Sequence, residues 1–360
     1  METKYVAPKN RKALLEYANG NFFLDEQISY VCLEKAVCLP YQSGKGEGGV
    51  VDIHGKFQMN TTLNASFGDG SYSFEENEVK NENKDAIFIG TLFSVFGHVI
   101  TDDLKKLWFL HSELGKKLLE EGADVVFITW HNQKLKPYVQ HILSLAGVNL
   151  EAAKCIDVPT KYKHIYVPED SLLYWGGKLC YTNEYRKTIE KIEQKIPWDN
   201  KPIVDKIYLS RTALHDWRDY GEKSVEATFA KLGYTIVHPE QLTFEQQISL
   251  YRRTLEIAST EGSLSHMFLF CRPSTKVIVL KKANYINDYQ MMVNAFAKVN
   301  AIYVDANHSI ECKNAWEGPF YLSLTKYLTR YLNIKKNDIF FLHLNYFVYI
   351  LRFVKFRYLS

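Results

Sequence analysis

Residues 255–266 read Leu255-Glu-Ile-Ala-Ser-Thr-Glu-Gly-Ser-Leu-Ser-His266, and this stretch decides the fold class. Its first five residues predict a buried strand, Gly262 predicts a turn, and the residues after the glycine predict the start of a helix. A strand that passes through a glycine turn into a helix is part of a β-α-β unit, from which parallel sheets are built. The neighbouring sequence repeats this alternation.

Two series of alternating elements are predicted, separated by the Pro-rich stretch 196–202. In the first series we expect strands at 86–93, 124–129 and 164–167, and helices over 99–118, 135–146 and 184–195. In the second we expect strands at 206–210, 233–237, 255–259, 276–280 and 301–304, and helices over 222–232, 243–254 and 262–270. The pattern predicts an α/β protein with two Rossmann-like domains facing a cleft, in which ligands lie beyond the carboxyl ends of the strands.

The predicted division of the chain has four parts. They are a β-rich lead-in at 1–85, an N-terminal Rossmann-like domain at 86–196, a C-terminal Rossmann-like domain at 203–310 and C-terminal helices with a basic, aromatic tail at 311–360.

Charge and cysteine content exclude several classes. There are 44 Lys and Arg against 41 Asp and Glu, so the net charge of +3 gives no nucleic-acid-binding surface. Six cysteines without a C-x-x-C spacing make a zinc site unexpected. The N-terminus lacks the apolar segment of a secretory signal and no stretch of 18 apolar residues exists, so we expect a cytoplasmic protein without a transmembrane helix.

The tail accounts for the net positive charge of the chain, with a local charge of +4 against −1 for the other 330 residues. Residues 331–360 contain five Lys and Arg but one acidic residue, Asp338. Residues 338–358 are rich in aromatic side chains and end in basic ones, which is typical of a helix that lies on an anionic membrane surface. A helix that packs back on the protein, or an oligomer contact, would have a similar composition.

A nucleotide-dependent oxidoreductase of the two-Rossmann type is disfavoured. Residues 44–49 satisfy G-x-G-x-x-G, but a strand-like run follows them where the dinucleotide motif needs a helix. We therefore predict a loop at this position.

The second series contains groups suited to a diphosphate. No two aspartates have the D-x-D spacing of a metal-binding pair, so we expect neither a metal nor another cofactor, and Arg, Lys and helix N–H groups would neutralise the phosphates. The candidates are Arg211, Arg218, Glu222, Glu261, Gly262, Ser263, Ser265 and His266. Ion pairing of the arginines and helix capping by the serines are the structural alternatives.

A series of short motifs occurs in a fixed order along the chain: Ser210-Arg211, Arg218-x-x-x-Glu222, Pro239-Glu240, Leu242-Thr-Phe-x-Gln-Gln-Ile248 and Glu261-Gly-Ser…Phe268-Leu-Phe270-x-x-Pro273. In this order and spacing the sequence resembles glycosyltransferase family 61. Upstream, His98-x-x-x-Asp102-x-Leu104 is similar to the family's H-W-x-x-D-x-L-P-R segment. The resemblance covers about residues 86–305.

This chain departs from the family pattern at three places. Gly221 replaces an Asn, Lys105-Lys106 replaces Pro-Arg, and Glu261 stands where His is usual. An anion at 261 would repel a diphosphate unless it is paired or directed at sugar hydroxyls, and His266 is a candidate to supply a donor group there.

The resemblance implies an inverting glycosyltransferase of GT-B-like architecture that uses a nucleotide-sugar, with a UDP-sugar favoured. Bacterial members are associated with capsular and other surface polysaccharides, so the implied acceptor is such a glycan or a lipid-linked one. An inverting displacement needs one base, for which His98 and Asp102 are the candidates, with Asp102 either orienting His98 or acting itself. The alternative is a non-catalytic subunit of a polysaccharide assembly complex, which the unusual Glu261 favours.

Overall fold

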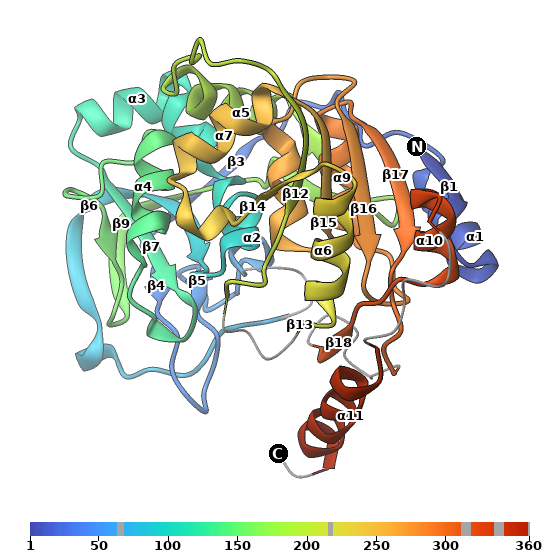
Figure 1. Ribbon diagram of the computed structural model, residues 1–360. Coiled ribbons are helices and arrows are strands. Elements are labelled where there is room, and N and C mark those ends of the chain that lie inside the picture. The colour runs from blue at the N-terminus through green and yellow to red at the C-terminus, as the bar shows by residue number, and fades with distance from the viewer. Residues whose placement is uncertain (63–67, 215–218, 311–317, 335–341, 359–360) are drawn as a thin grey trace. The chain divides into compact units, whose positions relative to one another are not determined.

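The computed structural model describes residues 1–62, 68–214, 219–310, 318–334 and 342–358 (Figure 1). The chain forms two compact units. One comprises Phe23–Pro197, and the other combines Met1–Phe22 with Trp198–Ser360. The boundary between Pro197 and Trp198 falls inside the Pro-rich stretch 196–202, which was predicted to separate the two series. The predicted lead-in at 1–85 is not one region, because its first 22 residues belong to the second unit.

A mixed seven-stranded sheet forms the core of the Phe23–Pro197 unit. Its strands are β3 (Tyr30–Glu34), β4 (Val37–Leu39), β5 (Gly49–Val51), β6 (Lys80–Leu92), β7 (Asp124–Thr129), β8 (Lys154–Cys155) and β9 (Thr160–Pro168). Their order is β5-β4-β9-β6-β7-β8, and β3 also pairs with β9. Strands β9, β6, β7 and β8 are parallel, whereas β3 and β4 run antiparallel to β9. Residues 44–48 lie in the loop between β4 and β5, which form an antiparallel pair, and Gly49 begins β5, so the loop prediction is confirmed.

Helices and a second, smaller sheet accompany this seven-stranded sheet. They comprise the helices α4 (Pro137–Leu145) and α5 (Asn183–Gln194) and a small sheet of β2 (Phe23–Leu24), β10 (Leu172–Trp175) and β11 (Lys178–Thr182). Apolar side chains of the parallel strands, including Ala86, Phe88, Val126 and Ile165, form its core.

The predicted single helix over 99–118 is wrong. The segment contains four short elements, α2 (Phe96–Val99), η4 (Asp102–Leu104), η5 (Leu107–His111) and α3 (Glu113–Glu120). Thr101, between α2 and η4, has a φ of −116° and a ψ of −76°, which depart from ideal helical values. Ser112 caps α3 by accepting a hydrogen bond from the Gly115 N–H. The apolar residues are buried in successive turns, so their spacing resembles that of one helix face.

The second unit contains a six-stranded parallel sheet. Its strands are β1 (Glu2–Tyr5), β12 (Val204–Leu209), β14 (Thr235–Val237), β15 (Thr254–Thr260), β16 (Lys276–Lys281) and β17 (Asn300–Asp305), in the order β1-β17-β16-β15-β12-β14. From β12 the chain moves first to β14 on one side and then to β15 on the other. The order therefore reverses between β12 and β15, where ligands bind in doubly wound sheets.

Helices α6 (Glu222–Lys231), α7 (Phe244–Arg252), α8 (Ser263–His266), α9 (Asp288–Phe296) and α10 (Lys326–Leu332) belong to this unit, together with η8 (Met267–Phe270). Buried Tyr208, Phe229, Ala258 and Ile278 are part of its core. At the N-terminus, β1 leads into α1 (Pro8–Ala18), an element that the sequence pattern did not predict.

The last helix packs on a two-stranded parallel sheet of β13 (Asp219–Tyr220) and β18 (Phe320–Tyr321) (Figure 1). This helix, α11, spans Leu342–Tyr358, and its Tyr349 and Phe353 are buried against Tyr321. Residues 338–341 of the predicted interfacial segment lie outside the described residues. In the described part of the chain, no helix has both the length and the apolar character that crossing a membrane requires.

Candidate functional site

Arg211 follows the carboxyl end of β12, next to the point where the strand order reverses. Its Nη1 lies 3.3 Å from Oδ2 of Asp219, and Oδ1 of the same carboxylate lies 3.2 Å from Nζ of Lys282. All three side chains are largely buried. One carboxylate thus holds two cations together at this edge of the sheet.

Glu222 fixes the backbone next to the Arg211 side chain. It begins α6, and its Oε1 accepts the Arg211 N–H at 3.2 Å and the Tyr208 hydroxyl at 3.1 Å. Burial, and then the nearby Asp219 carboxylate, raise the pKa of Glu222 to about 7. Glu222 therefore acts on Arg211 through the main chain, and Asp219 acts on its guanidinium.

Glu261 directly follows β15, and its buried carboxylate forms an ion pair. Its Oε2 lies 3.6 Å from Nζ of Lys281, which also donates a hydrogen bond to the Tyr285 carbonyl at 2.6 Å. Burial raises the pKa of Glu261, although the nearby lysines oppose the shift. Pairing with Lys281 reduces the repulsion that an anion at this position would exert on a diphosphate.

The turn at 262–266 is capped from within. Gly262 has a φ of 126°, in the region that favours glycine, and its N–H donates to Oγ of Ser265 at 3.0 Å. The Ser265 hydroxyl donates back to the Gly262 carbonyl at 2.9 Å. Ser265 therefore has the capping role that the sequence left open. Ser263 is half-buried, and the buried His266 ring lies 6.0 Å from the Tyr289 ring.

Sequence reasoning missed two residues of this site, Asp219 and Lys282, which link Arg211 to β16. The predicted candidate Arg218 lies outside the described residues. Lys282 directly follows β16, so the signal that selected Arg211, a cation at the carboxyl end of a strand, would have selected Lys282 as well.

His98 and Asp102 form a close pair in the other unit. Nδ1 of His98 lies 2.7 Å from Oδ2 of Asp102, and the Thr101 hydroxyl donates to the same oxygen at 3.2 Å. The Asp102 side chain is 6% exposed and that of His98 is 35% exposed. The pair predicted from helical spacing thus forms across the end of α2 and the start of η4.

Asp103, the neighbour of Asp102, faces a different group. Both of its carboxylate oxygens lie 3.1 Å from the Phe93 N–H, which donates to them. Burial raises the pKa of Asp103 well above its usual range. Asp103 anchors the segment that follows β6, and Asp102 is the carboxylate paired with His98.

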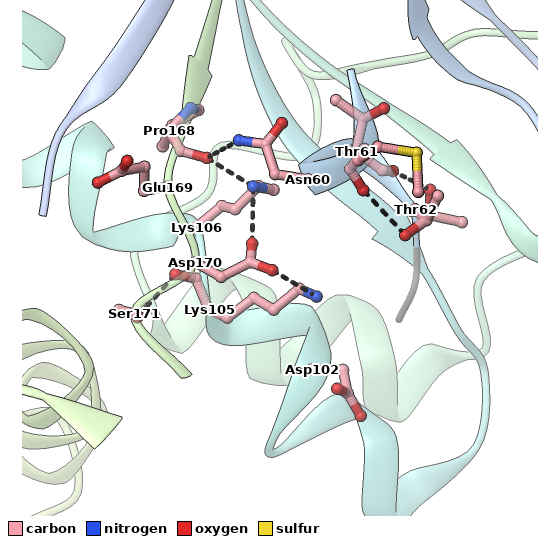
Figure 2. Close-up of polar contacts among 12 residues, drawn as sticks. Asn60, Thr61, Thr62, Asp102, Lys105, Lys106, Pro168, Glu169, Asp170 and Ser171 are labelled. Carbon is pink, nitrogen blue, oxygen red and sulfur yellow. Dashed lines mark hydrogen bonds and ion pairs between the residues drawn. The ribbon is translucent and has the colours of Figure 1, made fainter. Parts of the chain in front are cut away.

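The two residues after η4 are buried lysines that pair with one carboxylate. Figure 2 shows Lys105 and Lys106 directed at the two oxygens of Asp170. Nζ of Lys105 lies 3.0 Å from Oδ2, and Nζ of Lys106 lies 2.7 Å from Oδ1. Lys106 also donates to the Pro168 carbonyl at 2.5 Å, and burial lowers its pKa. The Ser171 hydroxyl donates to the Lys105 carbonyl at 2.6 Å. These contacts tie the segment after Asp102 to the end of β9.

No group of three or more His, Cys, Asp or Glu side chains with metal-binding geometry occurs among the described residues.

A protein-family model described as "Glycosyltransferase 61" matches residues 96–278, just over half of the chain. The matched region begins before His98 and ends within β16, so it includes residues of both candidate sites. No curated protein matches the chain.

Proposed function

The chain belongs to glycosyltransferase family 61, and from its membership we propose that it is a metal-independent, inverting glycosyltransferase with a GT-B-like arrangement. The donor is a nucleotide-sugar, with a UDP-sugar favoured. The acceptor is a growing capsular or other surface polysaccharide, or a lipid-linked glycan.

The observation that carries the proposal is the position of Arg211. It lies at the reversal of strand order, and Asp219 and Glu222 hold its side chain and backbone. A guanidinium fixed in advance binds phosphate oxygens at a lower entropic cost than a mobile one. Arg211 would therefore neutralise the leaving diphosphate, with the 261–266 turn beside it, and no metal ion would be needed.

An inverting displacement needs a base for the acceptor hydroxyl, and we assign this role to His98 of the Phe23–Pro197 unit. With its proton on Nδ1, His98 donates to Asp102, and in this tautomer the lone pair of Nε2 would accept the proton of the attacking hydroxyl. The buried Asp102 carboxylate stabilises the imidazolium that forms. The displacement then inverts the configuration at the sugar carbon.

We place the enzyme in the cytoplasm, against the inner surface of the membrane. The inward face of α11 is buried, whereas the large apolar side chains of Phe347, Val348, Leu351 and Val354 are exposed. Arg352 and Lys355 are exposed beside them. An apolar stripe bordered by cations suits anionic lipid headgroups, next to which a lipid-linked acceptor would be presented.

The donor assignment is tested by thermal shift with a panel of nucleotides and nucleotide-sugars, with and without a divalent metal. We expect a UDP-sugar to stabilise the wild-type protein without metal. Arg211→Ala should weaken donor binding at least about tenfold, because a charge-assisted hydrogen bond is lost. Arg253, which precedes the amino end of β15, provides the matched control Arg253→Ala. Stabilisation only in the presence of metal would disprove the metal-free mechanism.

The base is tested with two similar His–Asp pairs. His98→Asn should lower kcat by about 10²- to 10⁴-fold without changing donor affinity. His164, whose Nδ1 lies 2.8 Å from Asp85, provides the control, and His164→Asn should remain active. Equal loss in both variants would show that a general structural effect, not proton transfer, is responsible.

Membrane contact is tested by flotation with vesicles of phosphatidylcholine, with or without phosphatidylglycerol. The wild-type chain should float only with the anionic vesicles, and the Phe347→Ser/Leu351→Ser variant should not. Ile203→Ser/Leu255→Ser, which changes two exposed apolar residues elsewhere in the same unit, is the control. If both variants float equally well, α11 does not form the membrane contact.

A further inference from the structure

A cavity of about 380 Å³ lies in the Phe23–Pro197 unit, at the carboxyl ends of β7 and β8. Its polar lining comes from Thr129, Asn132, Gln133, Lys134, Gln140 and Asp157. Phe127 and Ile156 contribute to an apolar wall. The volume lies within the range of small-molecule sites, and one or two sugar rings fit such a space.

The cavity lies beside the segment that carries His98. Strands β6, β7 and β8 are parallel, so their carboxyl ends meet at one edge of the sheet, and the segment 93–98 follows β6 at that edge. The Phe93 ring lies 4.9 Å from the His98 ring and 4.5 Å from the Trp130 ring. Trp130 begins η6 (Trp130–Asn132), whose last residue lines the cavity.

A second contact comes from α4. Tyr138 donates a hydrogen bond to the Ser94 carbonyl at 2.8 Å, and Gln140 of the same helix lines the cavity. Two elements of the cavity wall therefore pack against the segment with the candidate base.

The backbone of the wall is held in an unfavourable conformation. His131 and Asn132 both have a φ of 52°, in the left-handed region. This region costs a residue with a Cβ roughly 1–2 kcal/mol, although Asn tolerates it better than most. The His131 ring stacks with the Tyr41 ring at 4.4 Å and with the Trp130 ring at 3.9 Å. Asn132 Nδ2 donates to the Tyr41 carbonyl at 3.1 Å. A strained residue such as His131, held in place by contacts of this kind, is typical of a functional site.

We propose that this cavity is a saccharide-binding site that holds the acceptor glycan next to His98. Amide, hydroxyl, carboxylate and ammonium groups together supply donors and acceptors for sugar hydroxyls, and the apolar wall suits the C–H face of a sugar ring. Lys134 and Asp157 balance in charge, which favours a neutral sugar. That the bound saccharide is the acceptor rests on the proposed function, whereas saccharide binding itself rests on the cavity alone.

The test is saturation-transfer NMR on the full chain with free glucose, galactose, mannose, xylose and N-acetylglucosamine. The wild type should give a signal with at least one of them, and Gln133→Ala/Asp157→Ala should reduce that signal at least fivefold. Asp25→Ala/Gln27→Ala, which changes two exposed residues of the same unit outside the cavity, should leave it unchanged. No signal with the wild type, or equal signals in the two variants, would overturn the proposal.

Failure of the proposed function has a different signature. If the protein binds a saccharide in the cavity but binds no nucleotide-sugar, the saccharide-site proposal stands and the proposed transferase function fails. The cavity variant should keep the full thermal shift with the donor, because none of the candidate donor residues lines the cavity. Loss of that shift would show that the variant is misfolded, and the single variant Gln133→Ala, which changes one exposed side chain, then decides the question.

Discussion

Glu222 shows how one buried carboxyl group joins the candidate donor site to the stability of the fold. It accepts hydrogen bonds from the Arg211 N–H and the Tyr208 hydroxyl while almost fully buried. Its pKa is raised from 4.5 to about 7, so the folded protein keeps a proton that the unfolded chain releases at a lower pH.

The pH dependence of stability follows from this shift. Between about pH 4.5 and about pH 7 the folded state binds more protons at Glu222 than the unfolded state, so stability falls as pH rises through this window, by up to about 3 kcal/mol. Glu222→Gln should remove this component, because the amide oxygen accepts the same hydrogen bonds without ionising. Urea unfolding of both proteins at about pH 5 and about pH 8 measures it. A difference between the two proteins that is independent of pH would contradict the assignment.

The start of α6 depends on Gly221, at the position where the family pattern that this sequence resembles has an Asn. Gly221 has a φ of 78°, and a Cβ there would lie 2.1 Å from the Leu322 carbonyl oxygen. Asn tolerates the left-handed region, but the approach of the chain after β18 leaves no room for its side chain here. Glycine at 221 thus has a local steric reason.

Two glycine variants separate the steric effect from the backbone effect. Gly55 has the same φ of 78°, with no atom within 4 Å of a Cβ. Gly55→Ala should cost about 1 kcal/mol for the left-handed backbone alone, and Gly221→Ala clearly more, at least about 3 kcal/mol. The free energies of unfolding by urea give both values. Similar costs at the two positions would contradict the proposed steric clash.

The connection between η4 and β9 depends on the Asp170 ion pairs (Figure 2). Asp170→Ala removes the carboxylate that neutralises two buried lysines and should destabilise the protein by about 3 kcal/mol or more. Lys106→Met should cost less, because Asp170 keeps its contact with Lys105 at 3.0 Å. Thermal unfolding of both variants checks this order, and the reverse order would show that Lys106 contributes mainly by other contacts.

At the scale of the whole molecule, the chain enters the second unit twice. β1 pairs with β17 in the sheet of that unit, and the Ala7 N–H donates to Asp305 at 2.6 Å. The chain then forms the whole of the Phe23–Pro197 unit before it returns at Trp198. The N-terminal segment is therefore a structural part of the C-terminal half.

Cleavage between the units should not release the C-terminal half. Trp198 and Ile203 are exposed, so limited proteolysis within 198–203 should yield fragments of about 1–197 and 203–360. These fragments should elute together from a size-exclusion column, because β1 remains in the sheet of the other fragment. Deletion of residues 1–22 before cleavage is the control and should weaken the association. Separate elution of the intact fragments would contradict the structural role of β1.

The sequence by itself determined the α/β character, the linker and most strands. β7 spans Asp124–Thr129 as predicted, because an apolar run bounded by turns specifies a buried strand locally. The pairing of His98 with Asp102 was also predictable, since the two residues are close in the chain. The family pattern added the assignment to glycosyltransferases.

Only the tertiary structure decided the rest. The four short elements at 96–120 have the apolar spacing of one helix, because burial in successive turns selects the same positions. The contact of Lys282 with Asp219, the pairing of Glu261 with Lys281 and the entry of β1 into the C-terminal sheet join residues far apart in the chain. Local propensity carries no information on such contacts, which arise when the strands align and bring their carboxyl ends to one edge.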